Sequence, residues 1–241
     1  MKDNKTKVIL LTGANSKICE DLIPQFFDHF DEIILHCRTK FKAYDKIKSL
    51  DKKNKVSYLV KADLCDEHQT KEMFEYIISR SNKIDYLVNF CGNYHNCDLL
   101  ETTLSQWNDM ISSNATAAFL LSKYIIPLMK ENNYGRIIHF ADSIADQYVS
   151  HEDIVPYHMA KHGILLLTKT LAKTYACANI TVNNISPGVV VDSVNKPHQS
   201  EIPMNRYASK QDIFEGIMFL FSKQASYITG QDLKIAGGYK L

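Results

Sequence analysis

Residues 8–19 read Val-Ile-Leu-Leu-Thr-Gly-Ala-Asn-Ser-Lys-Ile-Cys. The apolar run Val8–Leu11 predicts a buried strand, and the turn that begins at Thr12 and Gly13 leads directly into a helix. A tight turn between a strand and a helix gathers backbone N–H groups at the positive end of the helix dipole, where a dinucleotide phosphate can bind. This stretch therefore predicts a parallel α/β fold with a phosphate site after the first strand.

Short apolar runs alternate with amphipathic stretches along the rest of the chain. This alternation predicts right-handed crossovers and a single doubly wound (Rossmann-type) α/β domain over residues 1–241, with about seven parallel strands and helices on both faces. Residues 192–208 contain Pro197 and Pro203 and lack periodicity, so we expect a mobile substrate loop there. The expected strands are Val8–Leu11, Glu32–Cys37, Val56–Ala62, Asp85–Phe90, Arg136–Ala141, Thr181–Ile185 and Asp232–Ile235. The expected helices lie at about residues 17–30, 40–50, 67–81, 102–130, 157–178 and 209–222.

The composition excludes several classes of function. Lys and Arg number 28 and Asp and Glu number 27, so the formal charge of +1 gives no basic surface for nucleic acid or an anionic membrane. None of the six cysteines forms a CxxC pair, which fits reduced thiols better than disulfides or a zinc site. No glutamate lies between His158 and His162 in the way metalloprotease chemistry requires, so we expect these to be surface or packing histidines. We therefore expect a cytoplasmic protein that acts on a small molecule and holds no metal.

A second informative stretch is Tyr157-His158-Met159-Ala160-Lys161, which follows the fifth expected strand. Residues four apart share one face of a helix, so the Lys161 ammonium can approach both the Tyr157 phenol and a bound ribose. A free phenol titrates near ~10, and a neighbouring cation favours the phenolate. We therefore expect Lys161 to lower the pKa of Tyr157 and to make it a general acid and base.

These stretches resemble the short-chain dehydrogenase/reductase family, and the resemblance extends along nearly the whole chain. Residues 12–19 are similar to its TGxxxGxG turn, residues 157–161 to its YxxxK motif, and Pro187-Gly188 to the segment it places beside the nicotinamide. Asn114 matches the family's helix asparagine, which holds a water in the proton relay to the lysine. The resemblance implies an oxidoreductase with a nicotinamide cofactor, assembled as a homodimer or homotetramer.

The resemblance also implies which residues bind the cofactor. Lys17 and Cys19 stand where the motif has its second and third glycines, and Lys17 can place a charge beside a phosphate. Cys37 occupies the position of the carboxylate that an NAD-selective site uses, and Arg38 after it suits a 2′-phosphate. NADPH/NADP+ is therefore expected in preference to NADH. The expected cofactor-binding residues are Gly13, Asn15, Ser16, Lys17, Ile18, Arg38, Asp63, Leu64, Asn89, Cys91, Gly92, Tyr157, Lys161, Pro187, Gly188 and Val190.

The position of the family's catalytic serine is ambiguous in this chain. A gapless alignment of residues 137–142, Ile-Ile-His-Phe-Ala-Asp, sets Asp142 at that position and Ser143 one residue later. Asp142 precedes Tyr157 by 15 residues and Ser143 precedes it by 14, both longer than the family's usual spacing. The expected catalytic residues are Asn114, Asp142, Ser143, Tyr157 and Lys161, with the choice between Asp142 and Ser143 left open.

Several residues favour a particular substrate. Lys17, residues 36–38 and Asp142 are similar to the pteridine-reductase branch of the family, which uses an aromatic ring at the position of Tyr94 to hold the pterin. An aspartate beside Tyr157 can help to protonate a C=N nitrogen, whereas a carboxylate opposes the oxyanion that develops during ketone reduction. The first expectation is therefore a dihydropterin-type substrate, with Tyr94 in contact with it.

Two other functions stay open. Gly92 follows the general family instead of the branch, and Ser143 can supply a hydroxyl, so the alternative is a 3-oxoacyl-(acyl carrier protein)-type carbonyl reductase. The altered glycine turn also allows a protein that binds the cofactor without turnover. Tyr157, Lys161 and Asn114 argue against this last function, because a protein that only binds has no need of all three.

Overall fold

The computed structural model describes residues 6–150, 152–194 and 196–240. Seven parallel strands form one sheet in the order β3-β2-β1-β4-β5-β6-β7. The strands are β1 (Val8–Thr12), β2 (Glu32–Cys37), β3 (Val56–Lys61), β4 (Tyr86–Asn89), β5 (Gly135–Phe140), β6 (Ile180–Pro187) and β7 (Asp232–Ile235). The doubly wound parallel fold expected from the alternation of strands and helices is confirmed.

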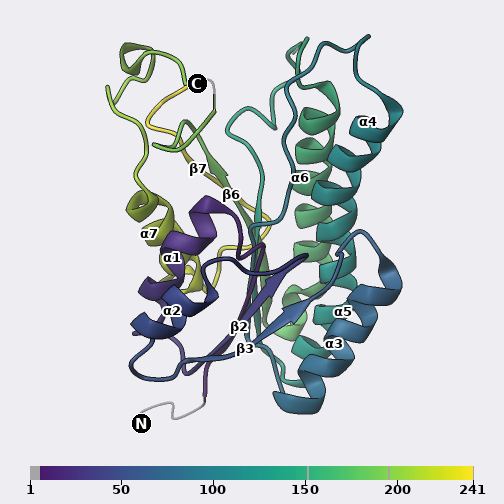
Figure 1. The fold of residues 1–241 in the computed structure, drawn as a ribbon, viewed down its shortest axis with the longest axis vertical. Helices are drawn as coiled ribbons and strands as arrows, with labels where there is room; N and C mark the ends of the chain where they lie inside the picture. The colour runs from purple at the N-terminus through teal and green to yellow at the C-terminus, as the bar shows by residue number, and fades with distance from the viewer. Residues whose placement is uncertain (1–5, 151, 195, 241) are drawn as a thin grey trace.

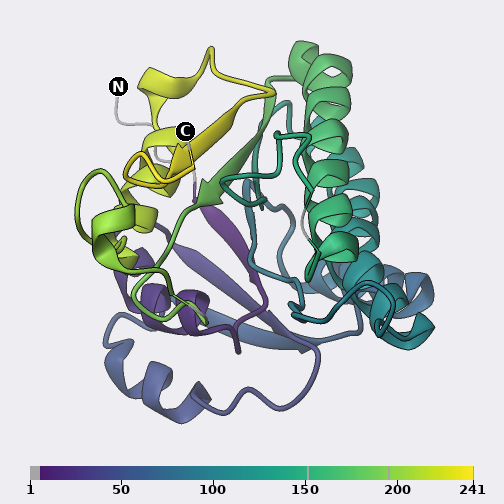
Figure 2. The same cartoon turned by 90° about the horizontal axis from the view of Figure 1, so that it is seen from above.

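Helices cover both faces of the sheet, as two perpendicular views show (Figure 1, Figure 2). One face carries α1 (Lys17–Phe26), α2 (Tyr44–Leu50) and α7 (Lys210–Phe221), and the other carries α3 (Glu67–Arg80), α4 (Leu104–Ile111), α5 (Ala117–Glu131) and α6 (Val155–Tyr175). Each layer packs its own apolar core against the strands, one around Phe26 and Phe214 and the other around Phe74 and Leu121. Because both faces are covered, every residue of β1 is buried, which explains its uninterrupted apolar sequence.

The stretch 102–130 does not form the single helix that its pattern predicts. A π-helical turn, Ser112–Thr116, separates α4 from α5. The side-chain amide of Asn114 donates to the main-chain oxygens of Met110 and Asn93, both at 2.9 Å, and so takes up a carbonyl that a regular helix would use. Such π turns often mark functional positions, and this one carries a predicted catalytic residue.

The described helices also bear on the membrane question. The longest of them, α6, has 21 residues and begins with Pro156 in its first turn, where a missing N–H costs nothing. None of the helices in the described ranges is both long and apolar enough to cross a membrane.

The strand order determines where a ligand can bind. β1 lies between β2 and β4, so the winding of the chain reverses between these strands. In open parallel sheets, ligands bind in the crevice outside the carboxyl ends of the strands at such a switch point. The turn after β1, Arg38 after β2 and Cys91 after β4 all lie at this edge.

Residues 192–208, expected to be a mobile substrate loop, connect to the fold at several points. Val190 and Ala208 form an isolated parallel bridge at the base of the segment. A short 3-10 turn, Gln199–Glu201, precedes Ile202, which is 2% exposed. The mobility and the substrate role of this segment stay predictions.

Candidate active site

The turn after β1 has the features of a phosphate cradle. Gly13 adopts a φ of +73°, and a Cβ there would lie 3.0 Å from the backbone carbon of Phe90, so only glycine fits. Ser16 caps α1 by accepting a hydrogen bond from the amide of Cys19 at 3.2 Å. Within the described ranges, the amides of Lys17 and Ile18 have no acceptor, as is usual for a first helical turn. These N–H groups can receive an anion at the positive end of the helix.

His36, at the carboxyl end of β2, holds this turn in place. Its Nδ1 accepts from the amide of Gly13 at 3.4 Å, and its Nε2–H donates to the carbonyl oxygen of Ala62 at 3.0 Å. The main-chain oxygen of His36 also accepts from the amide of Ala14 at 2.8 Å. Burial lowers the pKa of His36 to about 4, so the ring is neutral and can accept from Gly13. Sequence reasoning used His36 only as part of a family motif and missed this role.

A cleft of about 330 Å³ opens at the carboxyl edge of β1 to β4, within the size range of small-molecule sites. Eight of its lining residues belong to the predicted cofactor set: Gly13, Asn15, Ser16, Arg38, Asp63, Leu64, Cys91 and Gly92. The others are His36, Cys37, Thr39, Cys65, Phe90, Asn93, Ser113 and Ala117. The cleft therefore brings together half of the residues that the sequence assigns to cofactor binding.

The end of β2 offers a cation to this cleft and no carboxylate. Arg38 is exposed and lines the cleft, while the thiol of Cys37 donates to the carbonyl oxygen of Thr39 at 2.6 Å. Asp63 also lines the cleft, and its carboxylate accepts from the amide of Cys65 at 3.0 Å. The N-cap of α3 is Asp66. Asp63 therefore does not cap this helix.

Asn89 supports the cleft from within the sheet. It is 1% exposed, and its Oδ1 accepts from the hydroxyl of Thr12 at 2.9 Å and from the amide of Cys91 at 3.1 Å. Its Nδ2 donates to His139 Nδ1 at 3.4 Å, and His139 Nε2–H donates to Ser122 at 3.1 Å. Burial lowers the pKa of His139 to about 4, so this chain of hydrogen bonds runs through a neutral ring. Asn89 is absent from the lining of the cleft and positions Cys91 instead.

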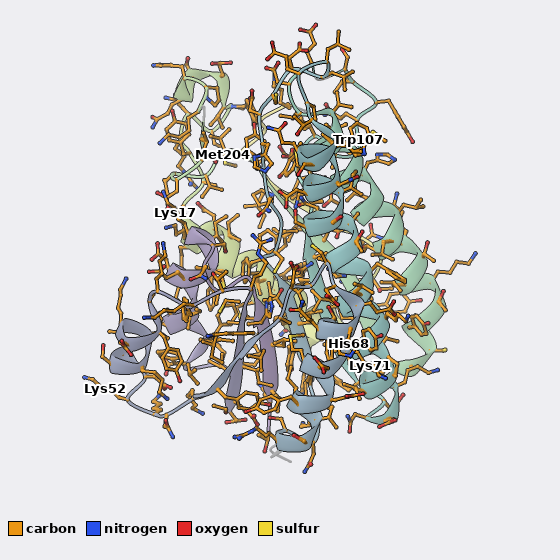
Figure 3. All side chains as sticks on the ribbon, turned by 45° about the vertical axis from the view of Figure 1, so that its right-hand side comes forward. Lys17, Lys52, His68, Lys71, Trp107 and Met204 are labelled. Carbon is orange, nitrogen blue, oxygen red and sulfur yellow. The ribbon has the colours of Figure 1, made fainter. Side chains whose placement is uncertain are left out.

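The remaining predicted cofactor residues lie outside the cleft. Lys17 is exposed at the start of α1, and its charge contributes to lowering the pKa of Asp192 (Figure 3). Pro187 ends β6, and a Cβ on Gly188 would lie 2.7 Å from Cα of Ala236, so the chains are in close contact there. Val190 is 4% exposed and, like Ile18, contributes no side chain to the cleft.

The first two turns of α6 carry Tyr157 and Lys161. Lys161 is 4% exposed, and its ammonium donates to the carbonyl oxygen of Phe140 at 2.8 Å. Burial lowers the pKa of Lys161 to about 8, although Asp142 opposes this shift. Its Nζ lies 5.4 Å from the centre of the Tyr157 ring.

The expected lowering of the Tyr157 pKa is wrong for this structure. Burial raises the pKa of Tyr157, and the neighbouring Asp142 carboxylate and Tyr94 raise it further. The ammonium of Lys161 is held by the Phe140 carbonyl and does not offset these effects. Tyr157 therefore stands in its neutral form, which is the form that donates a proton.

Asp142 and Ser143 lie in different surroundings. The charge of Asp142 acts on Tyr157 and Lys161, and one of its oxygens accepts from the amide of Ile144 at 3.0 Å. Ser143 is 4% exposed, and its hydroxyl makes no hydrogen bond with any residue the structure describes. Asp142 is thus the residue of the two whose side chain interacts with Tyr157.

Asn114 places an unpaired oxygen at the same end of the site. The residue is fully buried, and its Oδ1 has no hydrogen-bond partner among the described residues. A Cβ on Gly92 would lie 2.2 Å from this oxygen, so glycine is required beside it. A buried polar atom of this kind needs a partner, which agrees with the family's use of this asparagine to hold a water.

Tyr94 lies against Tyr157. The two rings meet edge to face at 5.0 Å, and Tyr94 is 42% exposed. Asn93, just before it, donates twice to the carboxylate of Asp109 at 2.9 Å, which ties the segment to α4. Tyr94 is therefore placed where an approaching substrate can touch it.

Two further histidines hold the loop that carries Asp142. The His158 ring donates to the carbonyl oxygen of Gln147 at 3.1 Å, and the His162 ring donates to that of Ala145 at 2.8 Å. Their spacing on α6 places both rings on the side of the helix that faces this loop. The expectation that they are packing histidines is therefore too general, because they connect the catalytic helix to the Asp142 loop. Within the described ranges, no group of His, Cys, Asp and Glu is arranged to hold a metal.

Comparisons with known proteins identify the family of this chain. A family model described as enoyl-(acyl carrier protein) reductase matches residues 31–240. The 3-oxoacyl-(acyl-carrier-protein) reductase of Buchnera aphidicola subsp. Schizaphis graminum is 30% identical over 96% of this chain and 96% of its own. The enzyme of the same name from Staphylococcus aureus strain Mu50 is 28% identical over 97% of this chain and 98% of its own.

Solved structures give the same result for the fold. A protein assigned as a 3-oxoacyl reductase from Bacillus thuringiensis superimposes with a TM-score of 0.85, at 26% identity over 98% of this chain and 99% of its own. A protein assigned as a short-chain alcohol dehydrogenase from Sinorhizobium meliloti gives a TM-score of 0.88, at 24% identity over 97% of this chain and 96% of its own, and shows the fold alone. The chain belongs to the short-chain dehydrogenase/reductase family of oxidoreductases.

Proposed function

We propose that this oxidoreductase uses NADPH to reduce the carbonyl group of a 3-oxoacyl thioester. The observation that carries the proposal is the pair of Tyr157 and the buried Lys161 on α6, in a chain whose relatives are named 3-oxoacyl-(acyl-carrier-protein) reductases. These relatives support the carbonyl alternative more than the dihydropterin-type substrate that the sequence placed first.

The choice of NADPH rests on the charge at the end of β2. Arg38 lines the cleft, and the position of the carboxylate that would bind a ribose hydroxyl is occupied by Cys37. An arginine is suited to a 2′-phosphate because its planar guanidinium can form two charge-assisted hydrogen bonds. The nicotinamide supplies the hydride when the cofactor is bound.

The chain's own part in the reaction is to move a proton. The neutral Tyr157 phenol donates a proton to the substrate oxygen as negative charge develops on that oxygen. The Lys161 ammonium, with a pKa of about 8 and its Nζ 5.4 Å from the centre of the Tyr157 ring, attracts the phenolate that this transfer leaves, although it does not lower the pKa of the resting phenol. Asn114, with its unpaired buried oxygen, can hold the water through which Tyr157 regains a proton.

A dihydropterin-type substrate is the second candidate because of one observation. In the gapless alignment the Asp142 carboxylate takes the position where a carbonyl reductase of this family has a hydroxyl, and its charge raises the pKa of Tyr157. A carboxylate disfavours an oxyanion but can assist protonation of a C=N nitrogen. Tyr94, beside Tyr157, then offers a ring for the pterin to stack on.

A substrate panel with NADPH separates the two candidates. Wild-type enzyme should oxidise NADPH with an acetoacetyl thioester and not with a dihydropterin. Asp142→Ser should raise thioester turnover by about tenfold, because it replaces a repelling charge with an oxyanion donor. Asp153→Ser, at an exposed aspartate further along the same loop, is the matched control and should change nothing.

The opposite pattern would transfer the proposal to the second candidate. In that case dihydropterin would be reduced and the thioester would not, and Asp142→Ser would abolish turnover while Ser143→Ala would have little effect.

The expected homodimer or homotetramer and the cytoplasmic location stay predictions, and light scattering of the purified protein tests the first of them.

A further inference from the structure

The chain's C-terminal segment lies between two other parts of the substrate end. We call residues 236–240 the tail, residues 196–207 the arm and residues 142–147 the Asp142 loop. Figure 1 shows the yellow end of the chain beside the lime-green arm, above the carboxyl edge of the sheet. None of the residues that line the cofactor cleft belongs to the tail, the arm or the Asp142 loop.

Two glycines join the tail to the arm. The amide of Met204 donates to the carbonyl oxygen of Gly237 at 3.0 Å. Gly238 has a φ of +85°, and a Cβ there would lie 2.9 Å from Cγ of Pro203. Gly237 has a φ of +60°, and its Cβ would lie 3.2 Å from a methyl of the buried Ile202. Only glycine combines these backbone angles with so close an approach.

Side chains join the tail to the Asp142 loop. Gln147 Nε2 donates to the carbonyl oxygen of Lys240 at 2.5 Å. At the base of the tail, Lys234 of β7 pairs with Asp146 at 2.6 Å. The loop is thus held by the tail on one side and by His158 and His162 of α6 on the other.

Tyr239 lies where these parts meet. Burial raises the pKa of its phenol, and the carboxylates of Glu201 in the arm and Asp142 in its loop raise it further. The two carboxylates belong to segments about sixty residues apart, and both act on one ring of the tail. The tail therefore connects the arm to the loop that carries Asp142.

We propose that the tail is a strap that fixes the arm and the Asp142 loop relative to Tyr157, with Gly238 and Gln147 as positioning residues for the substrate. Within the described ranges, neither Gly238 nor Gln147 lines the cofactor cleft, and the tail meets the predicted cofactor residue Gly188 only at Ala236. Loosening the strap at Gly238 or Gln147 should therefore raise the substrate KM and change NADPH affinity little. The kinetic part rests on the proposed reductase function, whereas the mechanical part does not.

The mechanical part is tested by hydrogen exchange of the enzyme without substrate. Gly238→Ala should speed exchange at the amide of Met204 by about tenfold, because the new methyl group cannot coexist with Pro203 at a left-handed backbone position. Gly230→Ala is the matched control, since Gly230 also has a positive φ (+73°) but faces Ala172 before β7. It should lower stability and leave exchange in the arm unchanged.

Gln147→Met removes the hydrogen bond to Lys240 without a backbone change, so it serves if Gly238→Ala folds poorly. It should speed exchange at the amides of Ile144 and Ala145, which bond to Asp142. Both variants should raise the substrate KM by about tenfold and keep the NADPH dissociation constant within about twofold of wild type.

The strap is ruled out if exchange in the arm and in the Asp142 loop is unchanged in both variants, or if Gly230→Ala changes it equally. It is also ruled out if the variants weaken NADPH binding as much as they raise KM. Altered exchange in an enzyme that reduces neither the acetoacetyl thioester nor the dihydropterin would confirm the strap and overturn the proposed function.

Discussion

The residues that line the cofactor cleft follow the carboxyl ends of four adjacent strands, whereas the residues around Asp142 come from loops that lie far apart in the sequence. Gly13, Arg38, Asp63 and Cys91 each stand within two residues of the end of a strand. Their positions are therefore set by the hydrogen-bonded ladder of the sheet. Gln147 and Lys240, in contrast, are 93 residues apart and meet through a single side-chain hydrogen bond.

The two regions also use their histidines differently. His36 and His139 lie in strands, are at most 1% exposed, and serve as neutral acceptors inside the sheet. His158 and His162 lie on a helix and donate to carbonyl oxygens of a loop. The cofactor end thus depends on neutral imidazoles inside the sheet, whereas the Asp142 loop is held by histidines of a helix.

The largest expected effect is at Tyr157, where a substitution should abolish most turnover at the substrate end and leave NADPH binding at the cofactor end intact. Tyr157→Phe keeps the ring and removes the proton donor, so turnover should fall by at least ~10²-fold, the lower range for general acid catalysis. NADPH binding, measured by fluorescence titration, should persist. Tyr94→Phe is the matched control, because it changes the neighbouring ring in the same way and should keep most turnover.

Unchanged turnover in Tyr157→Phe would contradict the proton-transfer mechanism. Lys161→Met should lower both turnover and NADPH affinity, because the proposed role of this lysine joins the two regions. A Lys161→Met variant with full turnover would show that Lys161 is not the residue that serves both catalysis and NADPH binding.

The next effect is a loss of folding stability in acid, which we attribute to the two buried histidines in the strands, His36 and His139. Burial lowers the pKa of His36 and His139 from 6.5 to about 4. Between pH 6.5 and pH 4 these imidazoles are therefore protonated in the unfolded chain and neutral in the folded chain. The free energy of unfolding should therefore decrease as the pH falls from 6.5 to 4, by about 3 kcal/mol for each imidazole. Urea unfolding over this pH range measures the decrease.

Histidine variants test where this loss originates. His139→Asn should remove about half of the pH-dependent loss, because one of the two buried imidazoles is gone. His158→Gln, on α6 next to the Asp142 loop, should keep the full pH dependence. The reverse result would place the acid-sensitive groups at the substrate end.

A smaller effect is expected at the cofactor end alone. Arg38→Asp should invert the preference for NADPH over NADH, and NADPH affinity should fall by about tenfold or more, the scale of a lost charge-assisted hydrogen bond. Lys40→Asp makes the same charge change in the same exposed segment, outside the cleft lining, and should leave the preference intact. Isothermal titration with both cofactors gives the comparison, and a wild type that binds NADH equally well would refute the assignment of Arg38.

The smallest expected effect is at Lys17. Its side chain is exposed and its charge is shared with Asp192, so Lys17→Gln should weaken NADPH binding by about threefold, the scale of one charge at a helix N-terminus. The effect should fade in high salt because the charge is solvent-exposed. A loss of tenfold or more would mean that Lys17 makes a buried contact with the cofactor that its exposure does not indicate.

Most of the cofactor end could be predicted from the sequence for a physical reason. A strand that ends in a polar residue marks a position at the edge of a parallel sheet, and the edge positions at a switch point converge. The turn at Gly13 and the arginine Arg38 follow strand ends in this way, whereas Ser16 and Asp63 were assigned through the resemblance to the family. The signal for His36 was also present, since it is the polar residue near the end of the apolar run Ile33-Ile34-Leu35. Its partners lie after β1 and after β3, so they depend on the register of three strands.

Much less of the substrate end could be predicted. The spacing of Tyr157 and Lys161 places them on one helix face, but the pKa of each depends on burial and on neighbours from elsewhere in the chain. The carbonyl of Phe140 that binds Lys161 belongs to β5, and no local pattern reveals it. The break between α4 and α5 was missed because the apolar periodicity continues through the π turn that Asn114 stabilises.

The proposed reaction is tested most directly by following the hydride itself. NADPH deuterated at C4 of the nicotinamide is incubated with the enzyme and either an acetoacetyl thioester or a dihydropterin. The deuterium content of each product is then measured by mass spectrometry. We expect one deuterium on the carbon of the former 3-oxo group of the thioester and none in the pterin. Deuterium found only in a tetrahydropterin would contradict the proposed function and assign Asp142 to C=N reduction.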